Sequence, residues 1–243
     1  MKKILTAFIL ALAAGASAQV AVLGTPSTNV HSSGATITVS HTVSSGSNTL
    51  LLVAASCVND AGTETVNSMT WGADAMTNLG EWETGNDNQI SIWYLKSPTA
   101  ATRTITATYN ATLAEGGAII AITLENVDQT TTFGTPVVDC AQTSPVPTNS
   151  VSSNTGDMVV DFVSCESCDG WTAGSGQTQY GNLNSDPTFS ASSVEAGAAS
   201  VEMAWTWDQG AGSEHRCQVG TNILQAAASG ASGQTIIIRS SDE

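Results

Sequence analysis

Two glutamates separated by one tryptophan are the residues of this chain best spaced for acid–base chemistry. Glu81 and Glu83 flank Trp82, and side chains two positions apart on a β-strand point to the same face. Paired carboxylates can hydrolyse a glycosidic bond, one as the acid and the other as base or nucleophile. The catalytic strand of sandwich glucanases carries three acids in the pattern Glu-x-Asp-x-x-Glu, which this sequence lacks. We therefore interpret the pair as solvated edge charges and predict no catalytic residue.

The cysteines are the second reactive group. There are five, all candidates for disulfide bonds: Cys57, Cys140, Cys165, Cys168 and Cys217. The Cys165–Cys168 spacing occurs in redox and zinc sites, but no second pair or suitably spaced histidine completes a zinc site. A redox pair begins a helix, whereas Asp169-Gly170 favours a loop. In an exported protein we expect structural disulfides, and because five is odd, at least one thiol stays free or pairs between chains.

Two predicted loop tips are rich in oxygen ligands. Asn59-Asp60 and Asn86-Asp87-Asn88 each offer carboxylate and amide oxygens. Calcium needs six to eight oxygens from several segments, and neither tip has a calcium-loop signature. We therefore expect turn residues here and predict no metal site and no cofactor, with calcium as the one cation that the acidic composition favours.

The tryptophans are the candidates for ligand binding, because exposed indole rings stack on the apolar faces of sugars. The chain has six of them. Trp205 and Trp207 lie on the same face of a predicted strand as Val201 and Met203, which indicates that they belong to the core. Trp82 and Trp171 have charged or glycine neighbours, so we predict these two as an exposed platform for a carbohydrate.

The first 18 residues have the features of a secretory signal peptide. Lys2 and Lys3 precede an apolar run over 4–14, and Ala16-Ser17-Ala18 resembles a bacterial cleavage site before Gln19. The apolar run is shorter than the ~20 residues that span a bilayer, and no later run is longer. We therefore predict a secreted protein, extracellular or at the cell surface, with no membrane span.

The charge balance excludes one class of partner. Without residues 1–18, four basic residues face 21 carboxylates, a formal charge of −17. Recognition of phosphates needs clustered lysine and arginine, so nucleic acid is excluded as a partner and anionic membranes are disfavoured. The excess negative charge is expected to keep the protein in solution.

The remaining chain is patterned as β-strands. Leu50–Ala55 and Met158–Val163 are short runs rich in apolar residues, bounded by turn residues and followed by Ser-Cys, which predicts strands buried on both faces. Ala35–Val43 and Arg103–Tyr109 alternate apolar residues with threonine or serine, which predicts half-buried strands. No useful helical period occurs, so the fold class is all-β.

The two halves of the chain, about 19–130 and 150–226, can be aligned with each other. The matching segments are Leu50–Ala55 with Met158–Val163, Arg103–Tyr109 with Ala199–Trp205, and Ala118–Val127 with Cys217–Ala226. A pseudo-repeat of this length predicts a jelly-roll-like, two-sheet antiparallel β-sandwich over 19–226, with strands from both halves in both sheets. Two separate immunoglobulin-like domains are the alternative.

The last segment, 227–243, combines a Gly/Ala/Ser linker with a short strand-forming stretch. Ile236, Ile237 and Ile238 would make a sticky edge if the stretch stayed unpaired. We expect this stretch either to fold back on its own sheet or to pair with another copy of the chain by strand addition.

Several short motifs together resemble a known module. They are Ser47–Val53, Met69-Thr-Trp-Gly72, Ile92-Trp-Tyr-Leu95, Gly156–Asp161 and Gly176–Gln179. Over about residues 30–226 the chain is similar to the concanavalin A-like or jelly-roll β-sandwich modules of bacterial secreted and phage structural proteins. The resemblance implies a sandwich fold, and its motifs are structural, so it supplies no catalytic residue.

The sequence thus favours a non-enzymatic extracellular protein with a structural or adhesive role. Such a protein could form a surface filament with other copies of itself through strand addition at 236–238. The alternative is a carbohydrate-binding module that recognises cell-surface glycans through Trp82 and Trp171. A glycoside hydrolase or lyase acting through Glu81 and Glu83 is a third, weaker hypothesis.

Overall fold

The computed structural model describes most of the chain after the predicted signal peptide. The described residues are 17–31, 33–58, 64–84, 88–113, 116–141, 147–166, 168, 170–185, 188–207 and 215–228. They form strands and no helix, so the predicted all-β class is confirmed. In these residues there is also no helix that could cross a membrane. The predicted subunit strand at Ile236, Ile237 and Ile238 lies outside the described residues.

The first half of the chain builds two antiparallel sheets. Its strands are β1 (Ala21–Val22), β2 (Ser27–His31), β3 (Gly34–Val43), β4 (Leu50–Val58), β5 (Val66–Trp71), β6 (Asp74–Ala75), β7 (Thr77–Thr84), β8 (Asn88–Lys96), β9 (Ala101–Leu113) and β10 (Gly117–Glu125). The inner N-terminal sheet has the order β1-β10-β4-β8-β7, with β2 also paired to β10. The outer N-terminal sheet has the order β3-β9-β5-β6.

The second half builds two further antiparallel sheets. Its strands are β11 (Val137–Ala141), β12 (Thr148–Val151), β13 (Met158–Glu166), β14 (Trp171–Ala173), β15 (Thr178–Ser185), β16 (Thr188–Ala196), β17 (Val201–Trp207) and β18 (Arg216–Ile223). The inner C-terminal sheet has the order β11-β18-β13-β16-β15, and the outer C-terminal sheet has the order β12-β17-β14.

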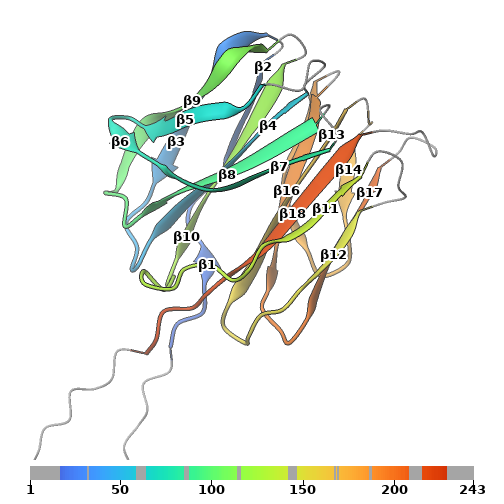
Figure 1. Cartoon of the computed structure of the whole chain (residues 1–243). Helices are drawn as coiled ribbons and strands as arrows, with labels where there is room; N and C mark the ends of the chain where they lie inside the picture. Colours follow the sequence, from blue (N-terminus) through green and yellow to red (C-terminus); the bar gives the residue numbers. More distant parts are fainter. Residues whose placement is uncertain are drawn as a thin grey trace, which may run out of the picture.

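The four sheets lie in successive layers, with the outer N-terminal sheet at the left of Figure 1 and the outer C-terminal sheet at the right. A central apolar core between the two inner sheets joins the halves and includes Leu52, Ile122, Val160 and Phe162. Separate apolar cores fill the space between the inner and outer sheet of each half.

Strand β4 shows why the sequence produces these layers. All of its residues are buried. Leu50, Leu52 and Ala54 face the central core, whereas Leu51 and Val53 face the outer N-terminal sheet. Successive side chains of a strand point to opposite faces, so an uninterrupted apolar run needs an apolar layer on each side. The prediction of a strand buried on both faces is confirmed.

The predicted number of sheets is wrong. The several antiparallel sheets are consistent with a β-sandwich, but the described residues form four of them, and each half builds its own pair. In a two-sheet sandwich one face of each strand meets solvent, whereas β4, β10 and β13 are buried on both faces. The halves are not separate immunoglobulin-like domains either, because they share the central core.

The connection between the halves is shorter than the sequence suggested. We expected the second half to begin at about residue 150, yet β11 and the start of β12 lie before that position. Strand β11 pairs with β18 from Val137↔Gly220 to Ala141↔Arg216. Its five residues lie in a segment rich in threonine, serine and proline, a composition that indicated a loop and not a short edge strand.

The first and last described residues lie at the same end of the molecule (Figure 1). Val127 bridges Gln225, and the amide of Ala226 donates to the carbonyl of Asn126 over 2.8 Å. The amide of Val20 donates to the carbonyl of Gly156 over 2.9 Å. These contacts fasten each end of the described chain to residues near the middle of the sequence.

Candidate binding face

The predicted acid pair lies at an open sheet edge. Glu81 and Glu83 are on β7, the edge strand of the inner N-terminal sheet, and both are exposed. Partial burial raises the pKa of Glu81, and the charge of Glu83 adds to that shift. Trp82 lies between them and packs against the central core. The carboxylates therefore project from an edge, as expected for solvated charges, and a catalytic role for them stays untested.

The predicted tryptophan platform is not formed. Trp171 is only 1% exposed, and its ring packs edge-on against Trp205 and Trp207 with centroid distances of 6.1 and 5.3 Å. Trp82 is half-buried. The prediction for Trp171 failed because its glycine neighbour suggested a loop, whereas β14 pairs with β17 and turns the indole inward.

The cysteines have structural positions. Cys140 and Cys217 are cross-strand partners on β11 and β18 and form one disulfide, and Cys165 forms another with Cys168. Cys57 is a buried thiol, and burial raises its pKa to about 12. A protonated thiol that is 1% exposed cannot reach another chain, so the odd cysteine does not provide the interchain bond considered from the sequence.

The predicted oxygen-rich loop tips, Asn59-Asp60 and Asn86-Asp87, lie outside the described residues. Asn88 is described, and it is buried at the start of β8, where its amide donates to the Ser164 hydroxyl over 3.2 Å. Within the described part of the chain, no group of three or more histidine, cysteine, aspartate or glutamate side chains could hold a metal ion.

Asp161, a buried aspartate with several hydrogen-bond partners, was not identified from the sequence. Asp161 interrupts the apolar run of β13 and accepts hydrogen bonds from Ser193 at 2.5 Å and from Trp205 and Gln218 at 2.7 Å each. Burial raises its pKa to about 6, although these three donors oppose the shift. Ser193 and Gln218 lie in the inner C-terminal sheet and Trp205 lies in the outer one, so the carboxylate crosslinks the two sheets.

A buried histidine crosslinks the N-terminal half in a comparable way. The His41 ring nitrogens lie 3.0 Å from the Ser27 hydroxyl and 2.8 Å from the Thr123 hydroxyl. Burial lowers the pKa of His41 to about 4, so the ring is neutral at pH 7. The ring joins β3 to the inner N-terminal sheet, because Thr123 lies on β10.

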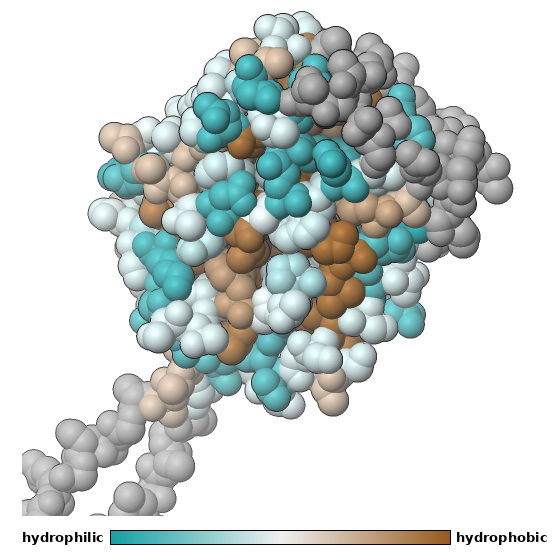
Figure 2. All heavy atoms as spheres, in the orientation of Figure 1, coloured by the Kyte–Doolittle hydropathy of each residue, from teal (hydrophilic) through white to brown (hydrophobic). Residues whose placement is uncertain are grey.

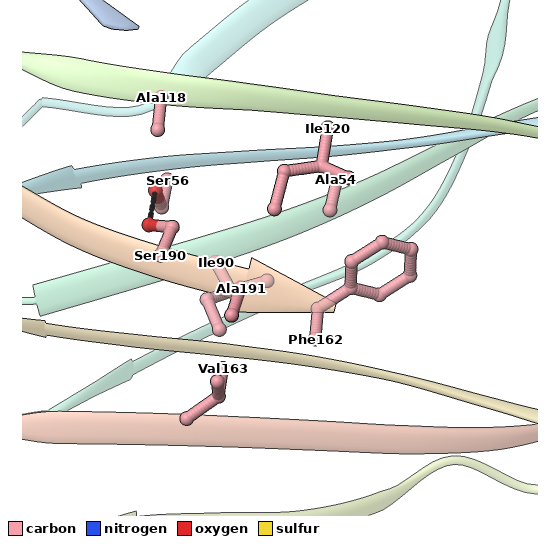
Figure 3. Close-up of a pocket in the computed structure, with 9 residues that line it drawn as sticks. All are labelled: Ala54, Ser56, Ile90, Ala118, Ile120, Phe162, Val163, Ser190 and Ala191. Atoms are coloured by element: carbon pink, nitrogen blue, oxygen red, sulfur yellow. Dashed lines mark hydrogen bonds between the residues drawn. The ribbon is translucent and has the colours of Figure 1, made fainter. Parts of the chain in front are cut away.

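The central core contains one small cavity, which is too small for a ligand. Figure 3 shows the Ser56 and Ser190 hydroxyls pointing at each other across the inner sheets, 2.7 Å apart, with Phe162 and Ile120 nearby. The cavity volume is about 10 Å³, at the lower limit for a single water molecule. This polar contact joins the two halves and offers no room for a substrate.

The outer N-terminal sheet presents a regular array of hydroxyl groups to solvent, which we name the hydroxyl face. Its residues are Thr36, Thr38, Ser40 and Thr42 on β3, Thr102, Thr104, Thr106 and Thr108 on β9, and Ser68 and Thr70 on β5. All are exposed or half-exposed. The alternate residues of the same strands, such as Ile37, Ile105 and Met69, point into the core. The apolar side of each strand therefore fixes which way the hydroxyls face.

These hydroxyl-bearing residues are aligned from strand to strand. Thr38 pairs with Thr106, and Thr106 pairs with Thr70 on its other side. The hydroxyls of Thr42 and Thr102 form a hydrogen bond of 2.7 Å, although the residues are 60 positions apart in the chain. The face is therefore a two-dimensional array and not a single row of threonines.

The hydroxyl face carries no charged side chain among the described residues of β3, β5 and β9. The charged residues of this sheet are Arg103 and Asp74, which form an ion pair of 2.6 Å. Arg103 is the cross-strand partner of His41 and Asp74 that of Trp71, and both partners are buried. The Arg103 guanidinium also covers the Trp71 ring at 4.6 Å. The hydroxyl face is therefore neutral, on a chain whose formal charge is −15.

The outer C-terminal sheet provides a natural comparison. Its outward positions pair Thr148 with Ala204, Ser150 with Glu202, and Thr172 with Thr206. The array is smaller than the hydroxyl face and is interrupted by a carboxylate and a methyl group. It therefore supplies matched control positions for experiments on the hydroxyl face.

Exposed apolar surface offers little to a partner. Figure 2 shows narrow hydrophobic bands between hydrophilic residues on the side in view. Among the described residues the exposed large hydrophobic side chain is Val138, at 40%. Recognition by the described surface must therefore depend mainly on polar groups.

The described sheet edges are partly blocked by side chains and bulges. The Asn29 amide donates to the Thr38 carbonyl on β3 over 2.6 Å, and the Gln179 and Asn182 amides donate to the carbonyl of Trp171 on β14. Edge strands β7 and β15 each contain a bulge. Such features hinder the pairing of a further strand, so β3, β7, β14 and β15 are poor acceptors for strand addition.

No protein-family model, curated protein or solved structure matches this chain. The resemblance to concanavalin A-like or jelly-roll modules therefore stays a prediction.

Proposed function

We propose that this chain is a non-enzymatic extracellular protein with an adhesive or structural role, and that it makes contact through the hydroxyl face. The observation that carries the proposal is the in-register, charge-free array on β3, β9 and β5. Threonine hydroxyls donate and accept hydrogen bonds, and their methyl groups add apolar contact. An array of this kind can bind a solid surface through many individually weak contacts.

The architecture supports such a role because it holds the face rigid. The inward-facing side chains of β3, β9 and β5 pack in an apolar core against the inner N-terminal sheet. The inner N-terminal sheet in turn packs against the inner C-terminal sheet. Two disulfides and the absence of a membrane-spanning helix among the described residues are compatible with an extracellular location.

We further propose that the two halves are copies of one jelly-roll-like unit. The inner sheets read β2-β10-β4-β8-β7 and β11-β18-β13-β16-β15, and the outer sheets read β3-β9-β5 and β12-β17-β14, in matching order. Across the central core β10 faces β16 while β8 faces β18, as expected for two equivalent units packed face to face. Only the first copy carries the charge-free hydroxyl face.

Contact through a face is favoured over a filament made by strand addition. The described edges are blocked at β3, β7, β14 and β15. Carbohydrate binding through Trp82 and Trp171 is disfavoured, because Trp171 is buried and cannot stack on a sugar. Glycans stay among the surfaces to be tested, since their hydroxyls could also meet the hydroxyl face.

The proposal is tested by retention of the mature protein on a panel of insoluble materials, including cellulose, chitin, mineral particles and ice. Thr104→Lys places a long, charged side chain in the middle of the array, and Thr206→Lys makes the same change on the outer C-terminal sheet. We expect Thr104→Lys to reduce retention at least several-fold and Thr206→Lys to leave it unchanged. Equal retention of both variants, or no retention on any material, contradicts the proposal.

A further inference from the structure

The spacing of the hydroxyl face limits what can bind it. Neighbouring strands lie ~4.8 Å apart, and alternate residues of one strand lie ~6.7 Å apart. The register places Thr36, Thr108 and Ser68 in one row and Thr38, Thr106 and Thr70 in the next. A small soluble ligand spans only a few of these positions, whereas a periodic solid can meet every row at once.

The side chains of the array are also preorganised. Threonine is branched at Cβ, so few χ1 rotamers are accessible on a strand. The Thr42 and Thr102 hydroxyls restrain each other through their hydrogen bond. Binding therefore costs little side-chain entropy, which matters when each contact is weak.

The chemistry of the face selects among periodic solids. The absence of charged side chains from the array disfavours ionic minerals. The aromatic residues of the same strands, Trp71 and Tyr109, are buried, so the array offers no ring to stack on a sugar. A neutral lattice of hydrogen-bond donors and acceptors remains, and crystalline water is such a lattice.

We propose that the hydroxyl face binds ice. Hydroxyl groups that repeat at ~4.8 Å across the strands and ~6.7 Å along them can form hydrogen bonds with many water molecules of a growing crystal at once. Each water-mediated hydrogen bond is nearly as favourable as a direct one. This inference rests on the hydroxyl face being the contact surface, as in the proposed function, and names the material that it contacts.

The test is the growth of single ice crystals in solutions of the mature protein, with crystal shape and the gap between melting and growth temperatures as readouts. We expect faceted crystals and a measurable gap. Thr38→Lys and Thr104→Lys should each reduce the gap at least several-fold, whereas Thr206→Lys should leave it unchanged. Circular dichroism and the unfolding midpoint verify that each variant is folded.

Two conservative variants separate the two parts of the threonine side chain. Thr104→Val keeps the shape and the methyl group but replaces the hydroxyl with a second methyl, and Thr104→Ser keeps the hydroxyl but removes the methyl. A lattice that uses both groups predicts a smaller gap for each variant than for the parent protein. Round crystals with no gap for the parent protein, or an equal loss in Thr206→Lys, overturn the inference.

The outcome for ice and the outcome for the proposed function are distinguishable. Retention on cellulose or chitin that is sensitive to Thr104→Lys, together with unaltered ice growth, overturns ice binding and leaves the adhesive role intact. Absence of retention on every material together with unaltered ice growth contradicts both.

Discussion

At the scale of single residues, two buried titratable groups control how stability depends on pH in opposite directions. The pKa of His41 falls from 6.5 to about 4 on folding, so the unfolded chain binds more protons below pH 6.5 and stability decreases as pH falls to 4. The pKa of Asp161 rises from 3.8 to about 6, so the folded chain binds more protons between these values and stability increases as pH falls through the same range.

Replacing the histidine isolates one of these effects. His41→Gln keeps a polar side chain near Ser27 and Thr123 but cannot titrate. We expect the stability advantage of the parent protein over this variant to shrink by roughly 3 kcal/mol between pH 7 and pH 4, from the size of the pKa shift. Urea unfolding at several pH values measures the difference, and parallel pH profiles for the two proteins contradict the assignment.

The two tryptophans predicted as a platform have different energetic roles. Trp171 is fully packed among Trp205 and Trp207, so Trp171→Ala should lower the free energy of unfolding by about 3–5 kcal/mol. Trp82 is half-buried at the margin of the central core, so Trp82→Ala should cost less. Chemical denaturation measures both, and an equal cost for the two variants contradicts the deeper burial of Trp171.

At the scale of elements, the sequence predicted individual strands better than their partners. The runs at Leu50–Ala55 and Met158–Val163 identified β4 and β13, because two-sided apolar runs have few other solutions. The alternation that makes the hydroxyl face was visible in Ala35–Val43 and Arg103–Tyr109. Their adjacency was not, since pairing across 60 residues depends on the whole fold.

The disulfide between β11 and β18 should stabilise the second half of the chain. It closes a segment with a sequence separation of 77, which restricts the unfolded chain and stabilises the fold by about 4 kcal/mol in the chain-entropy estimate. We expect the double change Cys140→Ser with Cys217→Ser to lower the thermal midpoint markedly. Cys57→Ser, at a buried thiol outside both disulfides, is the control, and a larger loss in that control contradicts the prediction.

At the scale of the whole molecule, the central core makes the two halves one folding unit. Phe162, on β13, is 1% exposed and packs in the core that also contains Leu52 and Ile122 from the first half. A sequence cannot show that two similar halves share a core, because the same alternation suits an outer face and an interface between sheets.

A single change in this core should therefore affect both halves. Phe162→Ala is expected to cost about 3–5 kcal/mol and to lower the protection of β4 and β13 amides together. Hydrogen exchange followed by mass spectrometry measures the two strands separately. Loss of protection in β13 with unaltered β4 would show that the halves unfold independently.

The central claim is that the protein makes contact through a face and not through its tail. Retention of a chain shortened after Ala228, measured beside the full chain and Thr104→Lys on the material that binds best, tests this directly. We predict that the shortened chain is retained as well as the full chain and that Thr104→Lys is not. Loss of retention in the shortened chain, with Thr104→Lys unaffected, would contradict the claim and favour strand addition by Ile236, Ile237 and Ile238.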